Sequence, residues 1–362
     1  MTTIERFMSL LPQEAAGRQV DAALITSESN RFYLTGFSST SSAVLVFRDA
    51  CYFLTDFRYA EAAERVIPAP CKVVCIKKMG ESLQALLKQH RARGVLLENE
   101  RLFLSQARLY EELFAGVGAA AIEDDTADRI LAEKRSIKTP EELEKIKAAQ
   151  KITDAAFTYI LGKIRPGVTE REIALELEFY MRRQGADGVA FDLIVVAGEN
   201  GSLCHGVPSG RTISRGDFVT MDTGVLLNGY RSDMTRTVAV GEASAEQKHA
   251  YDMVLKAQLA ALEAIKPGIP CSQVDRAARN ILEAEYKGAF EHATGHGVGV
   301  DIHERPRFSA SDETIIRPGM VVTVEPGIYL KGKFGLRIED MIVVTQDGCE
   351  NLTHSLKDLI IL

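Results

Sequence analysis

The stretch GDFVTMDTG at residues 216–224 has a second copy in the chain, GMVVTVEPG at residues 319–327. Both fit the pattern Gly-x-x-Val-Thr-x-acid-x-Gly, which places Asp222 and Glu325 at equivalent points of two similar strands. Each copy is followed by another apolar strand that carries an acid, Asp233 in YRSDMTRTVAV and Glu339 in LRIEDMIVV. The sequence therefore predicts one acid-bearing β-hairpin that occurs twice.

The first hairpin contains the pair Asn228-Gly229, which is typical of a two-residue primed turn. Counting outward from this turn sets Asp222 opposite Thr235 and diagonal to Asp233, on the same face of the sheet. Two carboxylates therefore converge. If the second hairpin does likewise across an approximate two-fold axis, four carboxylates meet at one place, an arrangement that we infer from the repeat alone.

Four carboxylates brought together need compensating charge, because burying one unpaired carboxylate costs several kcal/mol or forces it to take up a proton. Arg236 and Arg337, each near an acid, would give a structural ion network. Two divalent metal ions would instead match four negative charges with four positive ones. Oxygen-rich ligation with a single imidazole favours ions such as Mn²⁺, Co²⁺ or Zn²⁺, and paired ions ~3.5 to 4 Å apart can hold an activated water.

The rest of the chain predicts two domains. Residues 1 to about 130 alternate short apolar runs, such as SAVLVF and GVLLEN, with helical patterns, which indicates a small α/β domain. A different texture begins at Thr139 in TPEELEKIKAAQ, with a capping box and proline at the first helical position. The boundary is therefore expected at about residues 130 to 138. Further helices are predicted to start at Thr169, at Ser244 (ending at the KPG of residues 266–268) and near Ser272 (ending at Gly288).

These strands, together with TGHGVG at residues 294–299, resemble the pita-bread metallopeptidases: prolidase (Xaa-Pro dipeptidase), aminopeptidase P and methionine aminopeptidase, with creatinase as a metal-free relative. The resemblance runs from about residue 137 to the end, and the N-terminal part is similar to the creatinase-type N-domain. It implies an α+β fold with a pita-bread catalytic domain over residues 137–362. A smaller, creatinase-like α/β domain is expected over residues 1–132.

The resemblance carries over a complete set of metal ligands, namely Asp222, Asp233, His296, Glu325 and Glu339. By that resemblance, Asp233 and Glu339 bridge two divalent ions and Asp222 completes one coordination sphere. His296 and Glu325 complete the other sphere, and Glu325 accepts the proton of the bridging water as general base. Mn²⁺ is the first choice of metal, with Co²⁺, Zn²⁺ or Fe²⁺ as alternatives.

Of the three histidines in EHATGHGVGVDIHERP (residues 291–306), only His296 is thus expected to bind metal. Flanking glycines at positions 295 and 297 are expected to let the backbone pass close to the cluster. His303 and His205, the latter in LCHGVPSG, match family histidines that contact the substrate and stabilise the tetrahedral intermediate. An ordinary structural role is the alternative for either. For His292, a place at the pocket edge behind the ligands and a purely structural role stay open.

Four further residues are candidates for a role at the predicted site. Thr235 is either an ordinary strand threonine or a hydrogen-bond partner that orients a ligating carboxylate. Arg337 lies two residues before Glu339, so a strand presents both on one face, and by resemblance Arg337 balances carboxylate charge or meets substrate. Arg305 and Arg307 are either solvated surface residues or recognise a substrate C-terminus.

The implied activity is dinuclear metal-dependent hydrolysis of the bond preceding proline in short peptides, as in an Xaa-Pro dipeptidase. Aminopeptidase P, which accepts longer peptides, is the alternative. Methionine aminopeptidases usually lack this N-domain and generally space their last two acids more widely. A metal-free creatinase-like amidinohydrolase and a non-catalytic binding module are disfavoured by the complete ligand set.

Composition limits the other classes. The chain has 43 basic and 50 acidic residues and a net charge of −7, which argues against nucleic-acid or polybasic membrane surfaces. No apolar run approaches the ~18 residues of a transmembrane helix and no secretory signal is evident, so a cytoplasmic location is expected. The six cysteines are expected to be buried thiols rather than disulfides or a metal site. By resemblance the protein is a homodimer whose partners are short proline-containing peptides.

Overall fold

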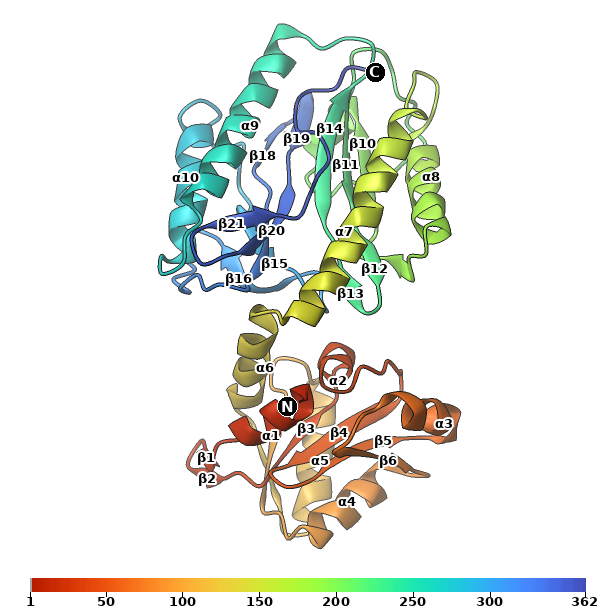
Figure 1. The fold of residues 1–362 in the computed structure, drawn as a ribbon, viewed down its shortest axis with the longest axis vertical. Helices are drawn as coiled ribbons and strands as arrows, with labels where there is room; N and C mark the ends of the chain where they lie inside the picture. The colour runs from red at the N-terminus through yellow and green to blue at the C-terminus, as the bar shows by residue number, and fades with distance from the viewer. Residues whose placement is uncertain (1) are drawn as a thin grey trace. The chain divides into compact units, whose positions relative to one another are not determined.

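A computed structural model describes residues 2–362, which divide into two compact units, one ending at Arg135 and the other beginning at Ser136 (Figure 1). The first unit contains a six-stranded mixed sheet in the order β6-β5-β4-β3-β7-β8. Its strands are β3 (Ala22–Ile25), β4 (Ser42–Phe47), β5 (Cys51–Thr55), β6 (Cys71–Cys75), β7 (Gly94–Leu97) and β8 (Ala120–Ile122). A small hairpin joins β1 (Glu14–Ala15) to β2 (Arg18–Gln19).

Helices cover both faces of this sheet. They are α1 (Thr3–Leu10), α2 (Glu28–Thr35), α3 (Phe57–Val66), α4 (Met79–Gln89), α5 (Leu104–Ala115) and α6 (Thr126–Ser136). Successive side chains of β3 enter two separate apolar cores, Ala23 and Ile25 on one face and Ala22 and Leu24 on the other. A sheet buried on both faces explains why its strands read as continuous apolar runs. The unit is α/β, as predicted.

All six cysteines are free thiols in the structure, and Cys51, Cys71 and Cys271 are buried. The prediction of buried thiols is wrong for Cys75, which is exposed. Cys75 is the last residue of β6, a strand at the edge of its sheet, and it shares a face with the buried Cys71, so its exposure comes from its place at the end of this edge strand.

The second unit has two pairs of long helices, α7 (Pro140–Leu161) with α8 (Glu170–Arg183) and α9 (Ala245–Ala264) with α10 (Cys271–Glu283). The predicted starts of α7, α8 and α9 are confirmed, each by a capping box at Thr139, Thr169 or Ser244. The predicted end of α10 at Gly288 is wrong. The helix stops at Glu283, and the chain continues in turns to Gly288, whose N–H donates to the Glu283 carboxylate.

Each helix pair packs on one β-sheet of the second unit (Figure 1). Helices α7 and α8 cover the sheet of β10 (Ile194–Ala197), β11 (Phe218–Thr223) and β14 (Met234–Ala239). Helices α9 and α10 cover the sheet of β16 (Glu304–Phe308), β15 (Gly295–Gly297), β17 (Val321–Val324), β20 (Asp340–Val344) and β21 (Cys349–Asn351). Short strands complete the unit: β9 (Gly188–Val189), β12 (Val225–Leu227), β13 (Tyr230–Arg231), β18 (Gly327–Leu330) and β19 (Phe334–Arg337).

The first acid-bearing hairpin has the predicted register, with Asp222 of β11 opposite Thr235 of β14. Asn228 and Gly229 both have positive φ, 50° and 79°, as a two-residue primed turn requires. At Gly224 the hairpin crosses into a separate small sheet of β13, β12 and β9. Asp233 therefore lies just before β14, where the chain returns from the small sheet to the sheet of β11 and β14.

The second hairpin has a different register. Val324 of β17 is opposite Asp340 of β20. Glu325 follows β17 and Glu339 precedes β20, so these two acids face each other directly rather than diagonally. The two hairpins meet at their second strands, where Glu339 N–H donates to the carbonyl of Thr235 at 3.1 Å. This contact brings all four acids to one place.

Within residues 2–362, none of the helices combines the length and the apolar character that crossing a membrane requires.

Candidate metal centre

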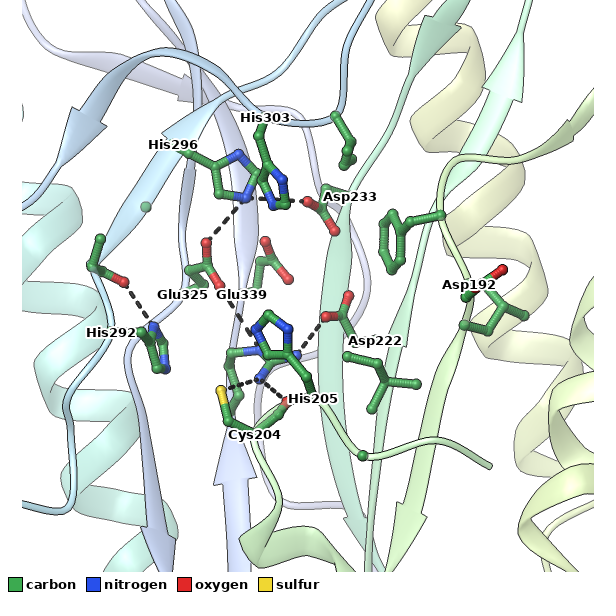
Figure 2. A pocket seen from close by; sticks show the side chains of 18 of the residues that line it. Asp192, Cys204, His205, Asp222, Asp233, His292, His296, His303, Glu325 and Glu339 are labelled. Atoms are coloured by element: carbon green, nitrogen blue, oxygen red, sulfur yellow. Dashed lines mark hydrogen bonds and ion pairs between the residues drawn. The ribbon is translucent and has the colours of Figure 1, made fainter. Parts of the chain in front are cut away.

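A cleft of about 630 Å³ opens where the two hairpins meet (Figure 2). All five predicted metal ligands line it and point toward one another. His205, His292, His303 and Arg337 also line it. Its remaining wall is largely apolar and includes Phe191, Leu193, Ile194, Val207 and Ile302.

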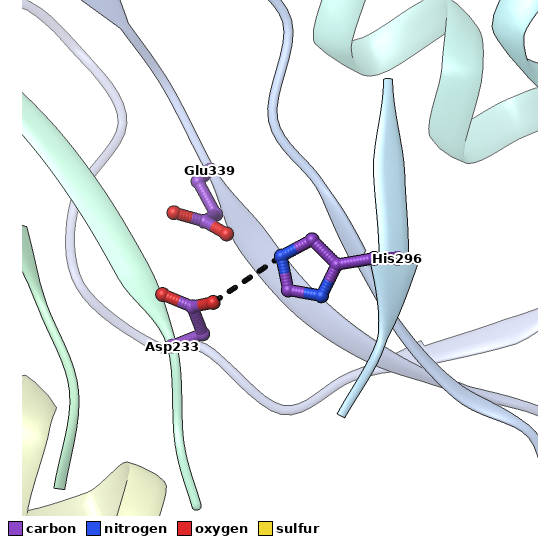
Figure 3. A group of neighbouring side chains, drawn as sticks. All are labelled: Asp233, His296 and Glu339. Carbon is purple, nitrogen blue, oxygen red and sulfur yellow. Dashed lines mark ion pairs between the residues drawn. The ribbon is translucent and has the colours of Figure 1, made fainter. Parts of the chain in front are cut away.

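Three of the five groups are already close enough to share one ion (Figure 3). Asp233, His296 and Glu339 each present one ligand atom, and these atoms lie within 4.8 Å of one another. His296 Nε2 is 3.6 Å from Asp233 Oδ2 and 3.2 Å from Glu325 Oε1. Asp222 is not part of this group of three, and its Oδ2 accepts a hydrogen bond from Arg337 Nη2 at 2.5 Å.

The backbone sets the tautomer of His296. Nδ1 lies 3.1 Å from the carbonyl oxygen of Gly297, which can only accept, so Nδ1 carries the hydrogen. Nε2 then faces the carboxylates, where it donates a hydrogen bond to Glu325 when the ring is charged and would offer its lone pair to a bound metal ion. Metal-bound histidines commonly donate their other ring N–H to a carbonyl or carboxylate in this way.

Thr235 and Arg337 order the carboxylates. The Thr235 hydroxyl, which is fully buried, donates to Glu339 Oε2 at 2.7 Å and accepts from Arg337 Nε at 2.9 Å. Arg337 Nε also lies 3.9 Å from Glu325 Oε2. The structure thus places Thr235 as the hydrogen-bond partner of an acid in the cluster rather than as an ordinary strand residue.

Arg236 does not compensate the cleft acids. Its guanidinium is buried behind them and pairs with Asp340 Oδ1 at 2.7 Å, while its Nη1 donates to the backbone carbonyl of Thr235 at 2.9 Å. The hypothesis of an ion network built from both arginines is therefore wrong for Arg236. Arg337 alone of the two brings its positive charge to the four carboxylates.

Burial and mutual repulsion disturb the pKa values of the cluster. Burial, reinforced by the charges of neighbouring acids, raises the pKa of Asp233 and of Glu339 well above the usual range. Burial also raises the pKa of Asp222, with Arg337 opposing it. Burial alone would raise the pKa of Glu325, but the hydrogen bond and charge of His296 bring it down to about 2. Glu325 is thus the most readily ionised acid of the four.

The residues fit a cation. Two buried carboxylate oxygens of the cleft, Asp222 Oδ1 and Glu339 Oε1, have no hydrogen-bond partner within residues 2–362. A buried acceptor left without a partner costs free energy, and a carboxylate more than a neutral group. Four carboxylates and one imidazole are also a suitable donor set for Mn²⁺, Co²⁺, Fe²⁺ or Zn²⁺.

The three other histidine positions differ in their surroundings. His205 and His303 are exposed at the rim of the cleft, and the ring of His303 lies edge-on to His296 with centroids 4.4 Å apart. Burial, helped by the neighbouring His296, lowers the pKa of His303. His292 is partly buried; its Nδ1 lies 2.8 Å from the Ala293 carbonyl and its Nε2 3.1 Å from the Tyr329 hydroxyl.

Two further predictions, one about a pair of arginines and one about a pair of glycines, can be compared with the structure. Arg307 lines the cleft, whereas Arg305 does not. Gly295 and Gly297 are required by neighbouring strands rather than by the acid cluster: a Cβ at Gly295 would lie 1.9 Å from the Thr323 carbonyl oxygen, and one at Gly297 2.5 Å from that of Arg305. The expectation that these glycines make room for the cluster is therefore wrong.

Sequence reasoning missed two residues that hold the site together. The Tyr329 hydroxyl accepts from Arg337 Nη1 at 2.7 Å, which leaves its own hydrogen for His292. The Thr323 hydroxyl donates to Glu325 Oε1 at 3.0 Å and accepts from the His296 N–H at 3.0 Å. Thr323 is part of the repeated Gly-x-x-Val-Thr pattern, so the repeat itself signals it; nothing local in the sequence distinguishes Tyr329.

Comparison with known proteins agrees with this geometry. The model of metallopeptidase family M24 matches residues 144–346, and that of the creatinase/prolidase N-terminal domain matches residues 9–137. An Xaa-Pro dipeptidase of Pyrococcus furiosus is 36% identical over 94% of this chain and 95% of its own. The structure of an Xaa-Pro dipeptidase from Bacillus anthracis is similar with a TM-score of 0.93 and 40% identity, covering 99% of each chain. That of an X-Pro aminopeptidase from Thermotoga maritima has a TM-score of 0.87 and 35% identity, covering 94% of this chain and 97% of its own.

Proposed function

The chain belongs to metallopeptidase family M24, and on this basis we propose that it hydrolyses the peptide bond preceding proline in Xaa-Pro dipeptides. The observation that carries the proposal is the convergence of four carboxylates and the His296 imidazole in one cleft with two unpartnered buried oxygens. Relatives named Xaa-Pro dipeptidase, similar over nearly the whole chain, support the choice of substrate.

The proposed metal ligands are Asp222, Asp233, His296, Glu325 and Glu339, which would hold two divalent ions, Mn²⁺ first. When bound, such ions supply Lewis acidity to a carbonyl oxygen and make water a better nucleophile at neutral pH. The charge balance supports two ions, since Arg337 brings one positive charge to four carboxylates.

Glu325 is proposed as the general base. It is ionised, its Oε1 is fixed by Thr323 at 3.0 Å and by His296 at 3.2 Å, and a base held in place can take a proton from attacking water. The exposed rim histidines, His205 and His303, are proposed to contact the peptide and to stabilise the oxyanion of the tetrahedral intermediate.

Arg337 and His292 are proposed to act indirectly, through the residues that they contact. Arg337 keeps Asp222 oriented and, through Tyr329, fixes the ring of His292. Both therefore hold the shape of the cleft wall where substrate lies. Arg307, a cation on the same wall, is proposed to bind the carboxylate of the proline residue.

Aminopeptidase P activity is the second candidate, favoured by the similarity to an X-Pro aminopeptidase structure. A carboxylate bound by Arg307 ends the substrate at proline, whereas an aminopeptidase must leave room beyond it. The test is release of free amino acids from Ala-Pro and Ala-Pro-Ala by metal-stripped protein with and without Mn²⁺. Metal-dependent cleavage of the dipeptide alone supports the proposal; preference for the tripeptide supports the second candidate, and cleavage of neither peptide overturns both.

Three further properties are proposals that rest on the resemblance and on the sequence: a homodimer, a cytoplasmic location, and a division into a creatinase-like domain of residues 1–132 and a catalytic domain of residues 137–362. Sedimentation, cell fractionation and limited proteolysis test them in turn.

A further inference from the structure

His205 lies on an exposed loop with little structure of its own. The loop, residues 203–208, follows the short helix η1 (Gly198–Ser202) and leaves Leu203 58% and Val207 81% exposed. Its backbone hydrogen bonds include Leu203 N–H to the Asn200 carbonyl and Gly206 N–H to the Leu203 carbonyl, both at 3.0 Å. Short-range bonds of this kind do not by themselves fix where an exposed side chain points.

A buried carboxylate ties the two ends of this loop together. Glu170, the first residue of α8, is fully buried. Its Oε1 accepts from Ala197 N–H at 2.7 Å and from Asn200 Nδ2 at 3.0 Å, before the loop. Its Oε2 accepts from Ser209 N–H at 3.0 Å and from the Ser209 hydroxyl at 2.6 Å, directly after the loop. One side chain therefore spans the base of the loop.

Further contacts hold the two ends of the loop beside the cleft. Arg171 N–H donates to the Ser209 carbonyl at 3.0 Å, so the start of α8 also holds the far end. A Cβ at Gly201 would lie 3.0 Å from Gly335 N, which shows how closely η1 approaches β19. Arg337, at the end of β19, donates to the Cys204 carbonyl at 3.4 Å. The loop is thus pinned at its base and at Cys204, next to His205.

The charge of Glu170 suits this role. An ionised carboxylate only accepts hydrogen bonds, and here four donors converge on it. Its position in the first turn of α8 is also favourable for a negative charge. A glutamine would keep the shape but turn an NH₂ group toward one set of donors, so two of the bonds are lost.

We propose that Glu170 is a positioning residue for His205: by clamping both ends of the loop it holds the imidazole at the cleft. The inference rests on the proposed function for the role of His205, but the clamp itself does not depend on it. Glu172, two residues along the same helix turn, is the matched control. Glu172 is exposed and caps α8 by accepting from Thr169 N–H, without touching the loop.

The experiment compares Glu170→Gln with Glu172→Gln by two readouts, amide hydrogen exchange of residues 203–208 and steady-state hydrolysis of Ala-Pro by the metal-loaded chain. In Glu170→Gln, loop exchange should rise at least about tenfold, since buried bonds to a charged acceptor are lost, and kcat should fall about tenfold. Metal content and exchange around His296 should not change. Glu172→Gln should leave the loop as in the wild type.

A double-mutant cycle separates positioning from a merely structural effect. In a His205→Ala background, Glu170→Gln should reduce kcat by less than about twofold, because the group that it positions is gone. An undiminished loss of kcat in that background, or unchanged loop exchange in Glu170→Gln, overturns the proposal. If the wild type does not cleave Xaa-Pro peptides, the proposed function fails while loop exchange still decides whether the clamp exists.

Ser209→Ala keeps the test decisive if Glu170→Gln does not fold. It removes one hydroxyl donor to Glu170 and leaves the backbone donor in place. Loop exchange should then rise about threefold, in keeping with the loss of one hydrogen bond. Exchange equal to that of the wild type would contradict the clamp.

Discussion

Three of the side chains proposed as metal ligands are each directed by one identifiable neighbour. The Gly297 carbonyl sets the tautomer of His296, the Thr235 hydroxyl turns Glu339, and Arg337 holds Asp222. These neighbours are uncharged or positive, so they orient the acids without adding to their repulsion. Each neighbour thereby fixes the direction in which its partner presents the atoms proposed to bind metal.

Changing Glu325 to Gln removes the proposed base and keeps the volume of the side chain. We expect kcat for Ala-Pro to fall more than about a hundredfold, the range of a lost general base. Glu313→Gln, at an exposed position that does not line the cleft, is the control and should retain wild-type turnover. Initial-rate assays with metal content measured in parallel check this, and near-normal turnover in Glu325→Gln would sink the assignment.

Changing Thr235 to Val tests the orientation of Glu339. Loss of the hydroxyl frees Glu339 Oε2 and leaves Arg337 Nε without its acceptor, so the affinity for Mn²⁺ should fall about 10- to 100-fold. Thr223→Val is a buried threonine control, in β11, whose hydroxyl lies 3.5 Å from the Met234 carbonyl. Titration against a competing chelator measures both. Equal Mn²⁺ affinity in Thr235→Val and wild type would contradict the role.

Among single residues, the sequence predicts those that belong to a repeat or a motif. The register of the first hairpin followed from Asn228-Gly229, and Asp222 and Thr235 do lie opposite each other. Tyr329 was out of reach, because its partners Arg337 and His292 come from other segments and meet only after folding. Arg236 and Arg337 pair with different acids because they lie on different faces of the sheets. Proximity to an acid in the sequence does not predict which face an arginine occupies.

Among the elements, strand β15 packs so closely on β17 that Gly295 has no room for a side chain. Changing Gly295 to Ala puts a Cβ 1.9 Å from the Thr323 carbonyl oxygen, so β15 and β17 must separate. The unfolding free energy should fall by about 1–3 kcal/mol, as in overpacked cores. Gly210→Ala, whose new Cβ would have nothing within 4 Å, should be tolerated. Urea titration of both variants decides, and equal midpoints would refute the constraint.

Helix α6 carries a buried acid whose titration opposes folding. Burial raises the pKa of Asp128 to about 6, with Glu98 and Glu100 adding repulsion, while the Asn99 N–H bond at 2.7 Å opposes the rise. A folded-state pKa above the unfolded one means that the native state holds the proton more tightly. Its contribution to stability is therefore present below about pH 4 and is lost as the pH rises through about 6.

Asp128→Asn removes this titration. Between pH 4 and pH 7 the wild type should lose about 1 kcal/mol of unfolding free energy relative to the variant, after allowance for solvent screening. The measurement is urea unfolding of both proteins across this pH range. Parallel pH profiles would contradict the prediction.

Helix starts were more predictable than helix ends and short strands. Thr139, Thr169 and Ser244 each make a capping box, which is a local pattern of four residues. The end of α10 is set by turns after Glu283, and a glycine downstream says little about them. Strand β8 is three residues long, and its pairing with β7 is a long-range contact that no local pattern announces.

Over the whole molecule, the fold class was predicted correctly because two long motifs specify it. The repeated hairpins and the glycine-rich His296 segment together indicated the pita-bread catalytic fold, and the family and its solved relatives confirm this. No motif of this kind in the sequence predicts the preferred metal or the oligomeric state. Metal preference depends on small differences in ligand spacing, and assembly depends on surfaces that carry no comparable motif.

The proposed activity requires that five side chains from the two hairpins and the His296 segment hold two catalytic metal ions. This requirement is tested by Ala-Pro hydrolysis by metal-stripped protein as Mn²⁺ is titrated in, with bound metal counted per chain. We expect negligible turnover without metal and a rise that levels off at about two ions per chain, the number expected of a paired-metal hydrolase. Full activity in the stripped protein, or no hydrolysis at any metal occupancy, would contradict the proposed metal centre.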